Sequence, residues 1–201
     1  MAVLAADTRS HVLADLIPAV DGRVKTAARE SALALAGAGF VGLTALISFT
    51  IPVVSPVPFT LQTFGVLLVG TAFGPVRALA AMALYMVAGV AGMPWFAEGA
   101  SGAAGATFGY VLAFLAAAPL AGHLARRGWD RSVRGTVGLM VLGNVVMYAI
   151  GASYLAVALG LTASEALGAG VLPFLAGDAV KIAFAAGLLP AAWWTVKKIK
   201  G

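Results

Sequence analysis

Long hydrophobic runs that charged residues seldom interrupt fill most of this chain. The 46 residues between Glu30 and Arg77 carry no formal charge, and Pro52, Pro56 and Pro58 break this stretch in the middle. Because proline and the residue before it resist helix, the stretch predicts two helices joined by a stiff, extended loop. Each helix is long enough to cross a bilayer, whose hydrocarbon core takes about 20 apolar residues at a rise of about 1.5 Å per residue.

Four further spans follow from the same pattern. Uncharged stretches of 20 residues after Arg77, 27 after Glu98 and 30 after Arg134 predict one span each, and a glycine-rich loop precedes the second of these. The last predicted span runs from about residue 172 to residue 196. We therefore expect an all-α integral membrane protein, with a cytoplasmic segment at 1–29 and a substrate-binding domain of six transmembrane helices at 30–201.

The composition agrees with a protein embedded in lipid. Of 201 residues, 61% are hydrophobic and only 10% are charged. Soluble domains carry about a quarter charged residues. A chain with so few would expose large apolar patches to water and aggregate.

The basic residues predict which way the chain crosses the membrane. With the N-terminus inside, twelve of the thirteen lysines and arginines lie on the cytoplasmic side, and the exception is Lys181 in the last span. This is the positive-inside bias of membrane proteins, and it places both termini in the cytoplasm. The net charge of +5 then reflects contact with anionic lipid and not with nucleic acid. Residues 10–20 have a modest amphipathic pattern, which fits either a helix at the inner membrane interface or a disordered stretch.

Motifs for catalysis are weak. The chain lacks the glycine-rich P-loop motif of ATP-binding proteins and contains no cysteine. The sequence GASG at 99–102 resembles the serine motif of intramembrane rhomboid proteases, but a serine nucleophile needs a base within hydrogen-bond reach. The two histidines, His11 and His123, are predicted at the cytoplasmic side, whereas Ser101 is predicted at the outer face. We therefore interpret this segment as a flexible loop, and we expect no enzymatic activity, cofactor or metal.

Asp178 and Lys181 are the strongest chemical signal. Each costs roughly 2.5–3.5 kcal/mol at the centre of a transmembrane helix. Their spacing of three residues places both on one face of the last helix, with Asp178 about 9 Å below its outer end at about 1.5 Å per residue. A structural ion pair is one interpretation, although such a pair is disfavoured relative to apolar packing. The other is a ligand site that opens toward the outer face.

Other polar and aromatic residues are predicted at a comparable depth in the outer half. Trp95 also fits an interfacial aromatic belt, Tyr148 also fits a core tyrosine, and Asn144 lies deeper and fits helix–helix contact. Their convergence predicts an outward-facing site for a small, largely apolar molecule with a polar head. The candidate residues beside Asp178 and Lys181 are Gln62, Trp95, Phe96, Glu98, Thr107, Tyr110 and Tyr148.

Four segments are more specific than a merely hydrophobic pattern. They are PVPFTLQTFGVLL at 56–68, GPVRALAAMALYMVAGVAGMPWFAEGASG at 74–102, GYVLAFLAAAPLAGHLARRG at 109–128 and LAGDAVKIAFAAGLLP at 175–190. Together they resemble BioY, the substrate-binding S component of biotin transporters of the energy-coupling-factor type. The resemblance implies a six-helix bundle in a prokaryotic cytoplasmic membrane that captures biotin from outside. It also implies partners that this chain lacks, a transmembrane coupling protein and two cytoplasmic ATPases.

The resemblance further implies that Asp178 and Lys181 contact the biotin head group, while Gln62 or Tyr110 serves the valerate tail. Glu98 departs from the amide or small residue that is common in the family, and it faces either the ureido ring or water. Two alternatives to a biotin-binding S component are an ion-coupled transporter of small solutes and an S component for another vitamin. A purely structural subunit is a third.

The first predicted helix carries small residues at four-residue spacing, Ala34, Ala38 and Gly42, with Ala32 and Ala36 on an adjacent line. Such ladders let helices approach closely in lipid. The resemblance implies that Ala34, Ala38 and Gly42 face outward and bind the coupling protein, whereas the residues alone fit internal packing equally well.

Overall fold

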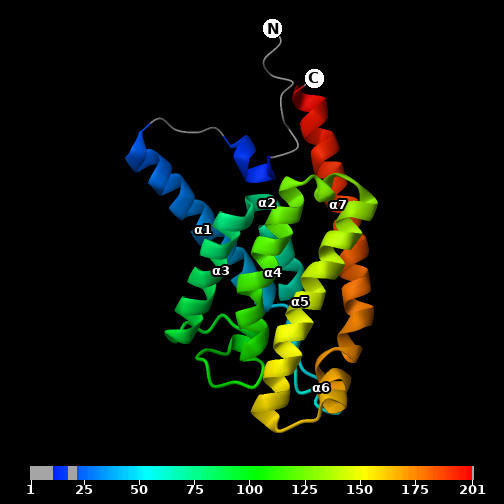
Figure 1. Cartoon of the computed structure of the whole chain (residues 1–201). Helices are drawn as coiled ribbons and strands as arrows, with labels where there is room; N and C mark the ends of the chain where they lie inside the picture. The colour runs from blue at the N-terminus through cyan, green and yellow to red at the C-terminus, as the bar shows by residue number, and fades with distance from the viewer. Residues whose placement is uncertain (1–10, 18–21, 201) are drawn as a thin grey trace.

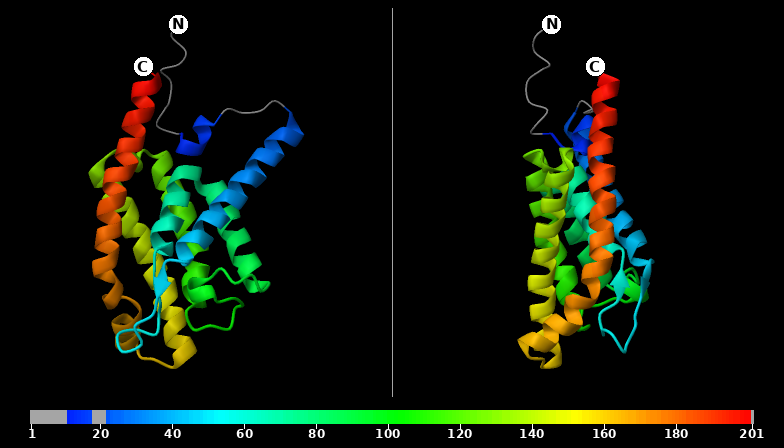
Figure 2. Two further views of the ribbon diagram at one scale, coloured as in Figure 1. Left: turned by 180° about the vertical axis from the view of Figure 1, so that it is seen from behind. Right: turned by 90° about the vertical axis from the view of Figure 1, so that its right-hand side faces the viewer.

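A computed structural model of the chain describes residues 11–17 and 22–200, and it is mostly helical (Figure 1). The long elements form a bundle in which α4 packs against α2, α3 and α5, while α1 lies on α3 and α2, and α7 lies on α5 (Figure 2). In chain order the elements are η2 (Leu13–Leu16), α1 (Arg23–Ala45), β1 (Ser48–Phe49), β2 (Phe59–Thr60), α2 (Gln62–Phe73), α3 (Pro75–Val90), η3 (Ala97–Gly99), α4 (Phe108–Arg126), η4 (Trp129–Arg131), α5 (Val133–Leu159), α6 (Ala163–Gly170), η5 (Leu172–Phe174) and α7 (Leu175–Lys200).

The predicted helical class is confirmed, with differences in detail. Within the described part of the chain, three segments are long and apolar enough to cross a membrane, namely α4, α5 and the stretch Ala163–Ile199, which includes α6 and most of α7. Helices α2 and α3 are shorter apolar helices of 12 and 16 residues. The proline-rich loop contains a small antiparallel ribbon, in which Ser48 pairs with Thr60. Neither this ribbon nor the short helix α6 was predicted.

A single glycine separates α2 from α3. Gly74 has a φ of 82°, a left-handed conformation that glycine adopts without strain, and Pro75 fills the first position of α3. Small residues also set the spacing of α2 and α4, because a Cβ atom on Gly70 would lie 2.3 Å from the carbonyl oxygen of Ala118. This close approach is the packing that small residues allow in lipid.

The described N-terminal residues, 11–17, form a strap across one end of the bundle. Val12 is fully buried in the main core. Asp15 pairs with Arg77 of α3 at 2.6 Å, and Arg29 of α1 donates to the carbonyl oxygens of Ala14 and Ile17 at 2.8 and 3.0 Å. The burial of Asp15 alone would raise its pKa, but the hydrogen bond and charge of Arg77 hold this pKa below its usual value.

The strap makes up the described part of the amphipathic segment predicted at 10–20. Its residues 11–17 pack against the bundle, whereas residues 10 and 18–20 lie outside the described part of the chain. Of the predicted cytoplasmic segment at 1–29, residues 1–10 and 18–21 lie outside the described part of the chain, and residues 23–29 already belong to α1, which begins at Arg23. The boundary at residue 30 stays a prediction.

The small residues of the predicted docking ladder on α1 face the interior of the bundle. Ala38 is 1% exposed and belongs to the core, and a Cβ atom on Gly42 would lie 3.1 Å from the ring of Trp95. Ala34 is half-buried on the same side. These residues face inward because α1 packs closely against α3 and against Trp95 in the loop that follows α3, and only small side chains fit at that contact. The adjacent line of Ala32 and Ala36 is exposed instead.

Candidate functional site

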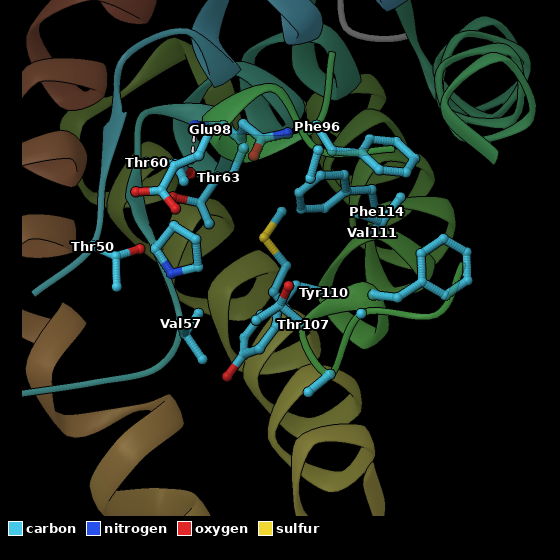
Figure 3. Close-up of a pocket in the computed structure, with 18 of the residues that line it drawn as sticks. Thr50, Val57, Thr60, Thr63, Phe96, Glu98, Thr107, Tyr110, Val111 and Phe114 are labelled. Carbon is cyan, nitrogen blue, oxygen red and sulfur yellow. Dashed lines mark hydrogen bonds between the residues drawn. The ribbon is translucent and has the colours of Figure 1, made fainter. Parts of the chain in front are cut away.

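A cavity of about 520 Å³ lies at the end of the bundle opposite the strap. The loops that follow α1 and α3 form part of its wall, and helices α2, α4, α5 and α7 supply the rest. Figure 3 shows Phe96, Val111 and Phe114 grouped on one side of the cavity and Thr50 and Val57 on another. The cavity is mainly apolar with a few polar groups, which is typical of sites for small molecules.

A network of four side chains from three helices forms one charged part of the wall. Lys181 donates to Oδ1 of Asp178 at 2.8 Å and to the hydroxyl of Thr63 at 2.9 Å. Thr63 in turn donates to Oδ1 at 3.4 Å, and Tyr148 donates to Oδ2. The Asp178 residue is only 4% exposed, so this carboxylate depends on its partners for stability.

Gln62 directly precedes Thr63 of the network, and hydrogen bonds to Tyr85 and on to Trp95 hold its side chain in place. Its amide nitrogen donates to the hydroxyl of Tyr85 at 2.6 Å, and this hydroxyl donates to the carbonyl oxygen of Trp95 at 2.9 Å. The indole of Trp95 returns a hydrogen bond to the carbonyl oxygen of Tyr85 at 2.9 Å. Trp95 therefore packs behind the wall and is not among the described residues that line the cavity, and its contact with a ligand stays a prediction.

Tyr110 has a dual position. Its ring lines the cavity, while its hydroxyl donates to the carbonyl oxygen of Gly170 at 2.6 Å and ties α4 to the end of α6. A Cβ atom on Gly170 would lie 2.5 Å from that hydroxyl oxygen, so glycine is required for the contact. Thr107, which directly precedes α4, also lines the cavity.

Glu98 lies on the cavity wall in the loop after α3. It is exposed and has a φ of 58°, and it is the non-glycine residue with positive φ in the described part of the chain. Its backbone N–H donates to the hydroxyl of Ser48 at 2.9 Å, which joins this loop to the ribbon after α1. A left-handed conformation at a residue other than glycine costs energy and is often associated with function.

The uncharged loop after α1 closes one side of the cavity. The Ser55 hydroxyl donates to the carbonyl oxygen of Ala169 at 2.7 Å and accepts from the N–H of Val57 at 2.9 Å. The ring of Phe59 lies 4.6 Å from that of Phe174. These contacts hold the loop against α6 and the start of α7.

The cavity brings together eight of the nine predicted ligand residues, all except Trp95. Sequence reasoning missed Thr63, although it lies within the segment PVPFTLQT and directly follows Gln62. It also missed the contribution of the loop after α1, including Thr50 and Val57. No pattern in the sequence shows which way the first turn of α2 faces.

A family model described as the BioY family matches residues 17–198. This chain belongs to the BioY family. A probable biotin transporter BioY of Pyrococcus horikoshii is 38% identical over 120 residues, which cover 58% of this chain and 70% of that protein. The biotin transporter BioY of Rhizobium etli is 31% identical over 116 residues, which cover 53% of this chain and 62% of that protein.

A solved structure resembles this BioY chain along most of its length. It is the crystal structure of the S-component for biotin from an ECF-type ABC transporter, with a TM-score of 0.74 and 22% sequence identity. The match covers 87% of this chain and 94% of the other. The two proteins therefore share a fold.

Proposed function

We propose that this chain is the membrane-embedded biotin-binding S component of an energy-coupling-factor transporter. The observation that carries the proposal is the pairing of Asp178 and Lys181 in the wall of a largely apolar cavity, within a chain of the BioY family. Membership alone leaves the ligand open, whereas the network has unfilled hydrogen-bonding positions that suit a cyclic urea.

The unfilled positions can be counted. A carboxylate offers about four acceptor positions, and Asp178 uses three, for Lys181, Thr63 and Tyr148. An ammonium has three N–H donors, and Lys181 uses two within the described residues. One acceptor position on Oδ2 of Asp178 and one N–H of Lys181 therefore remain, on two residues that are hydrogen-bonded to each other. The ureido ring of biotin presents an N–H donor beside a carbonyl acceptor, which complements this pair.

The remainder of the cavity fits the rest of the ligand. Apolar and aromatic side chains enclose a thiophane ring and an alkyl chain, as the wall of Phe96, Val111 and Phe114 does here (Figure 3). A valerate carboxylate is best placed at Thr107, because the start of a helix carries a partial positive charge. Figure 3 shows Thr107 apart from Glu98, whose charge would repel the acid.

We further propose that α1, α2, α3, α4, α5 and α7 are the six transmembrane helices, with both termini in the cytoplasm of a prokaryote. Four basic residues lie at helix ends on the same side of the bundle as the strap (Figure 1). They are Arg77 at the start of α3, Arg126 at the end of α4, Arg134 at the start of α5 and Lys198 near the end of α7. The positive-inside bias assigns that end to the cytoplasm. The cavity then opens toward the outside, where an uptake protein meets its ligand.

Delivery of biotin inward requires partners, and we propose a transmembrane coupling protein with two cytoplasmic ATPases. The inward-facing ladder is unsuited to docking, but Ala32 and Ala36 form an exposed line of small residues on α1. Gly39 continues this surface, since a Cβ atom there would meet nothing within 4 Å. We assign the coupling protein to this surface.

Titration calorimetry on the detergent-purified chain tests the proposal. We expect saturable binding of biotin, a weaker response to biotin methyl ester, and none to thiamine or riboflavin. A rise in melting temperature with biotin provides an independent measure, because a ligand that binds only the folded state stabilises it. Absence of biotin binding by both methods, or preference for another vitamin, would overturn the assignment.

A further inference from the structure

Thr63, which is labelled in Figure 3, is the residue through which α2 joins the charged network. Its hydroxyl oxygen accepts from the ammonium of Lys181, and its hydrogen is donated to Oδ1 of Asp178. One hydroxyl therefore completes a ring of three hydrogen bonds with two residues of α7. The hydroxyl of Thr63 is uncharged, so it acts on the site by holding the side chains of Asp178 and Lys181 in position.

The ring determines where the Lys181 ammonium lies. Lysine has a flexible four-carbon side chain that ends in a compact charge with rotatable donors. Two acceptors on different helices, Thr63 and Asp178, hold two of these donors at 2.9 and 2.8 Å. The direction of the third N–H is then fixed. With Asp178 alone, the ammonium would be free to pivot about a single hydrogen bond.

We infer that Thr63 is a positioning residue that fixes the free N–H of Lys181 for the ligand carbonyl and thereby selects a neutral cyclic urea over a cationic guanidinium. The inference rests on the proposed function and deepens it. An ammonium held in this position donates a hydrogen bond to a ligand carbonyl, and it repels a cationic group that occupies the place of that carbonyl. Specificity of this kind combines an attractive contact with a repulsive one.

The analogue 2-iminobiotin makes the distinction measurable. It has the ring system and tail of biotin, but its carbonyl is replaced by an imine that is protonated at neutral pH. Its cationic head can still donate to Asp178, but it offers Lys181 no acceptor. Rejection of this analogue therefore depends on the ammonium staying in place. If loss of the Thr63 hydroxyl lets the ammonium move away, biotin loses the hydrogen bond to its carbonyl and binds more weakly. The cationic analogue loses no hydrogen bond to Lys181 and is repelled less.

The experiment measures the dissociation constants of biotin and 2-iminobiotin at neutral pH for the full-length parent, Thr63→Val and Thr63→Ser. We expect Thr63→Val to weaken biotin binding about tenfold or more, the usual effect of losing a hydrogen bond to a charged group. Binding of 2-iminobiotin should change by no more than about threefold, so the dissociation constant of 2-iminobiotin divided by that of biotin falls. Thr63→Ser keeps the hydroxyl and should retain the parent ratio.

Thr71→Val is the matched control. Thr71 lies two turns further along α2, is fully buried, and donates to the carbonyl oxygen of Leu67 at 2.7 Å. Its replacement reports the cost of a lost threonine hydroxyl in this helix, and it should leave the ligand ratio unchanged. Equal losses of both ligands in Thr63→Val would show a general structural role and overturn the inference. Unchanged biotin affinity in that variant would overturn it as well.

A second measurement separates this inference from the proposed function. Acylation of Lys181 in the ligand-free protein is followed by mass spectrometry. An ammonium held by two acceptors should react more slowly than one held by a single acceptor, so Thr63→Val should react faster and Thr63→Ser should not. Equal rates in all three proteins would refute the positioning role even if biotin binds. Failure of the parent to bind biotin would instead refute the proposed function.

Discussion

Trp193 near the end of α7 donates its indole N–H to Oδ2 of Asp130, a carboxylate with no exposed surface. The hydrogen bond from Tyr148 to Asp178 lies toward the other end of the same helix. Helix α7 is thus joined to α5 and its preceding turn by a carboxylate toward each end. The two carboxylates differ in their partners, because only Asp178 has an ammonium within 3 Å among the described residues.

Asp130 should make stability depend on pH. Burial raises the pKa of Asp130, although the hydrogen bond from Trp193 and the charge of Arg131 oppose this shift. The unfolded chain therefore loses this proton at a lower pH than the folded chain, and stability falls as pH rises from about 4 through the raised pKa. We expect Asp130→Asn to have a higher melting temperature than the parent above this window and a similar one below it.

Melting curves in detergent from about pH 4 to pH 8 check this prediction. Trp193→Phe is the companion variant, since it removes the donor and leaves the carboxylate, and it should lower the melting temperature throughout. A difference between parent and Asp130→Asn that does not vary with pH would contradict a buried, titrating carboxyl.

Asp178→Asn and Lys181→Met should each weaken biotin binding while leaving a folded protein. Loss of a hydrogen bond to a charged group costs about 1.5–3 kcal/mol, roughly ten- to a hundredfold in affinity. The double variant should lose less than the two single variants combined, because each single change leaves the other charge without its partner. Calorimetry measures the affinities, and melting temperature without biotin controls for unfolding. Parent-like binding in either variant would show that the pair is structural.

Glu98→Gln should bind biotin more tightly than the parent at low salt. The carboxylate of Glu98 lies on the cavity wall and repels the valerate anion, so its neutralisation should improve affinity by roughly two- to fivefold, less as salt screens the charge. Biotin methyl ester, which lacks the negative charge, should show no such gain. Weaker binding of both ligands to Glu98→Gln would show instead that Glu98 accepts a hydrogen bond from the ureido ring.

Tryptophan at two neighbouring positions of α1 should separate docking from folding. Ala36 is exposed, so Ala36→Trp should keep the parent's melting temperature and biotin binding while losing copurification with the coupling protein. Ala38 is in the core, so Ala38→Trp should lower the melting temperature through overpacking. Val157→Trp, at an 86% exposed position on α5, is the control for a surface tryptophan. Full copurification of Ala36→Trp would exclude this surface as the docking site.

The sequence was most informative where a charge is costly. Asp178 and Lys181 stand out because lipid penalises charged side chains, so their pairing on one helix face could be predicted from composition and spacing alone. The interior direction of Ala38 did not, because small residues serve internal and external helix contacts equally. Trp95 and Thr63 show the same limit, since the orientation of a loop end or of a first helical turn depends on packing between distant segments.

The contact between Gly42 and Trp95 has a consequence for communication across the molecule. Gly42 lies on the helix proposed to meet the coupling protein, and Trp95 is hydrogen-bonded to Tyr85, which in turn holds Gln62 at the cavity. Four residues in direct contact thus span the distance between docking helix and ligand. If docking shifts α1 and alters biotin affinity by some factor, thermodynamic reciprocity requires biotin to alter the affinity for the coupling protein by the same factor. Biotin-bound and biotin-free copies of this chain would then compete unequally for the coupling protein.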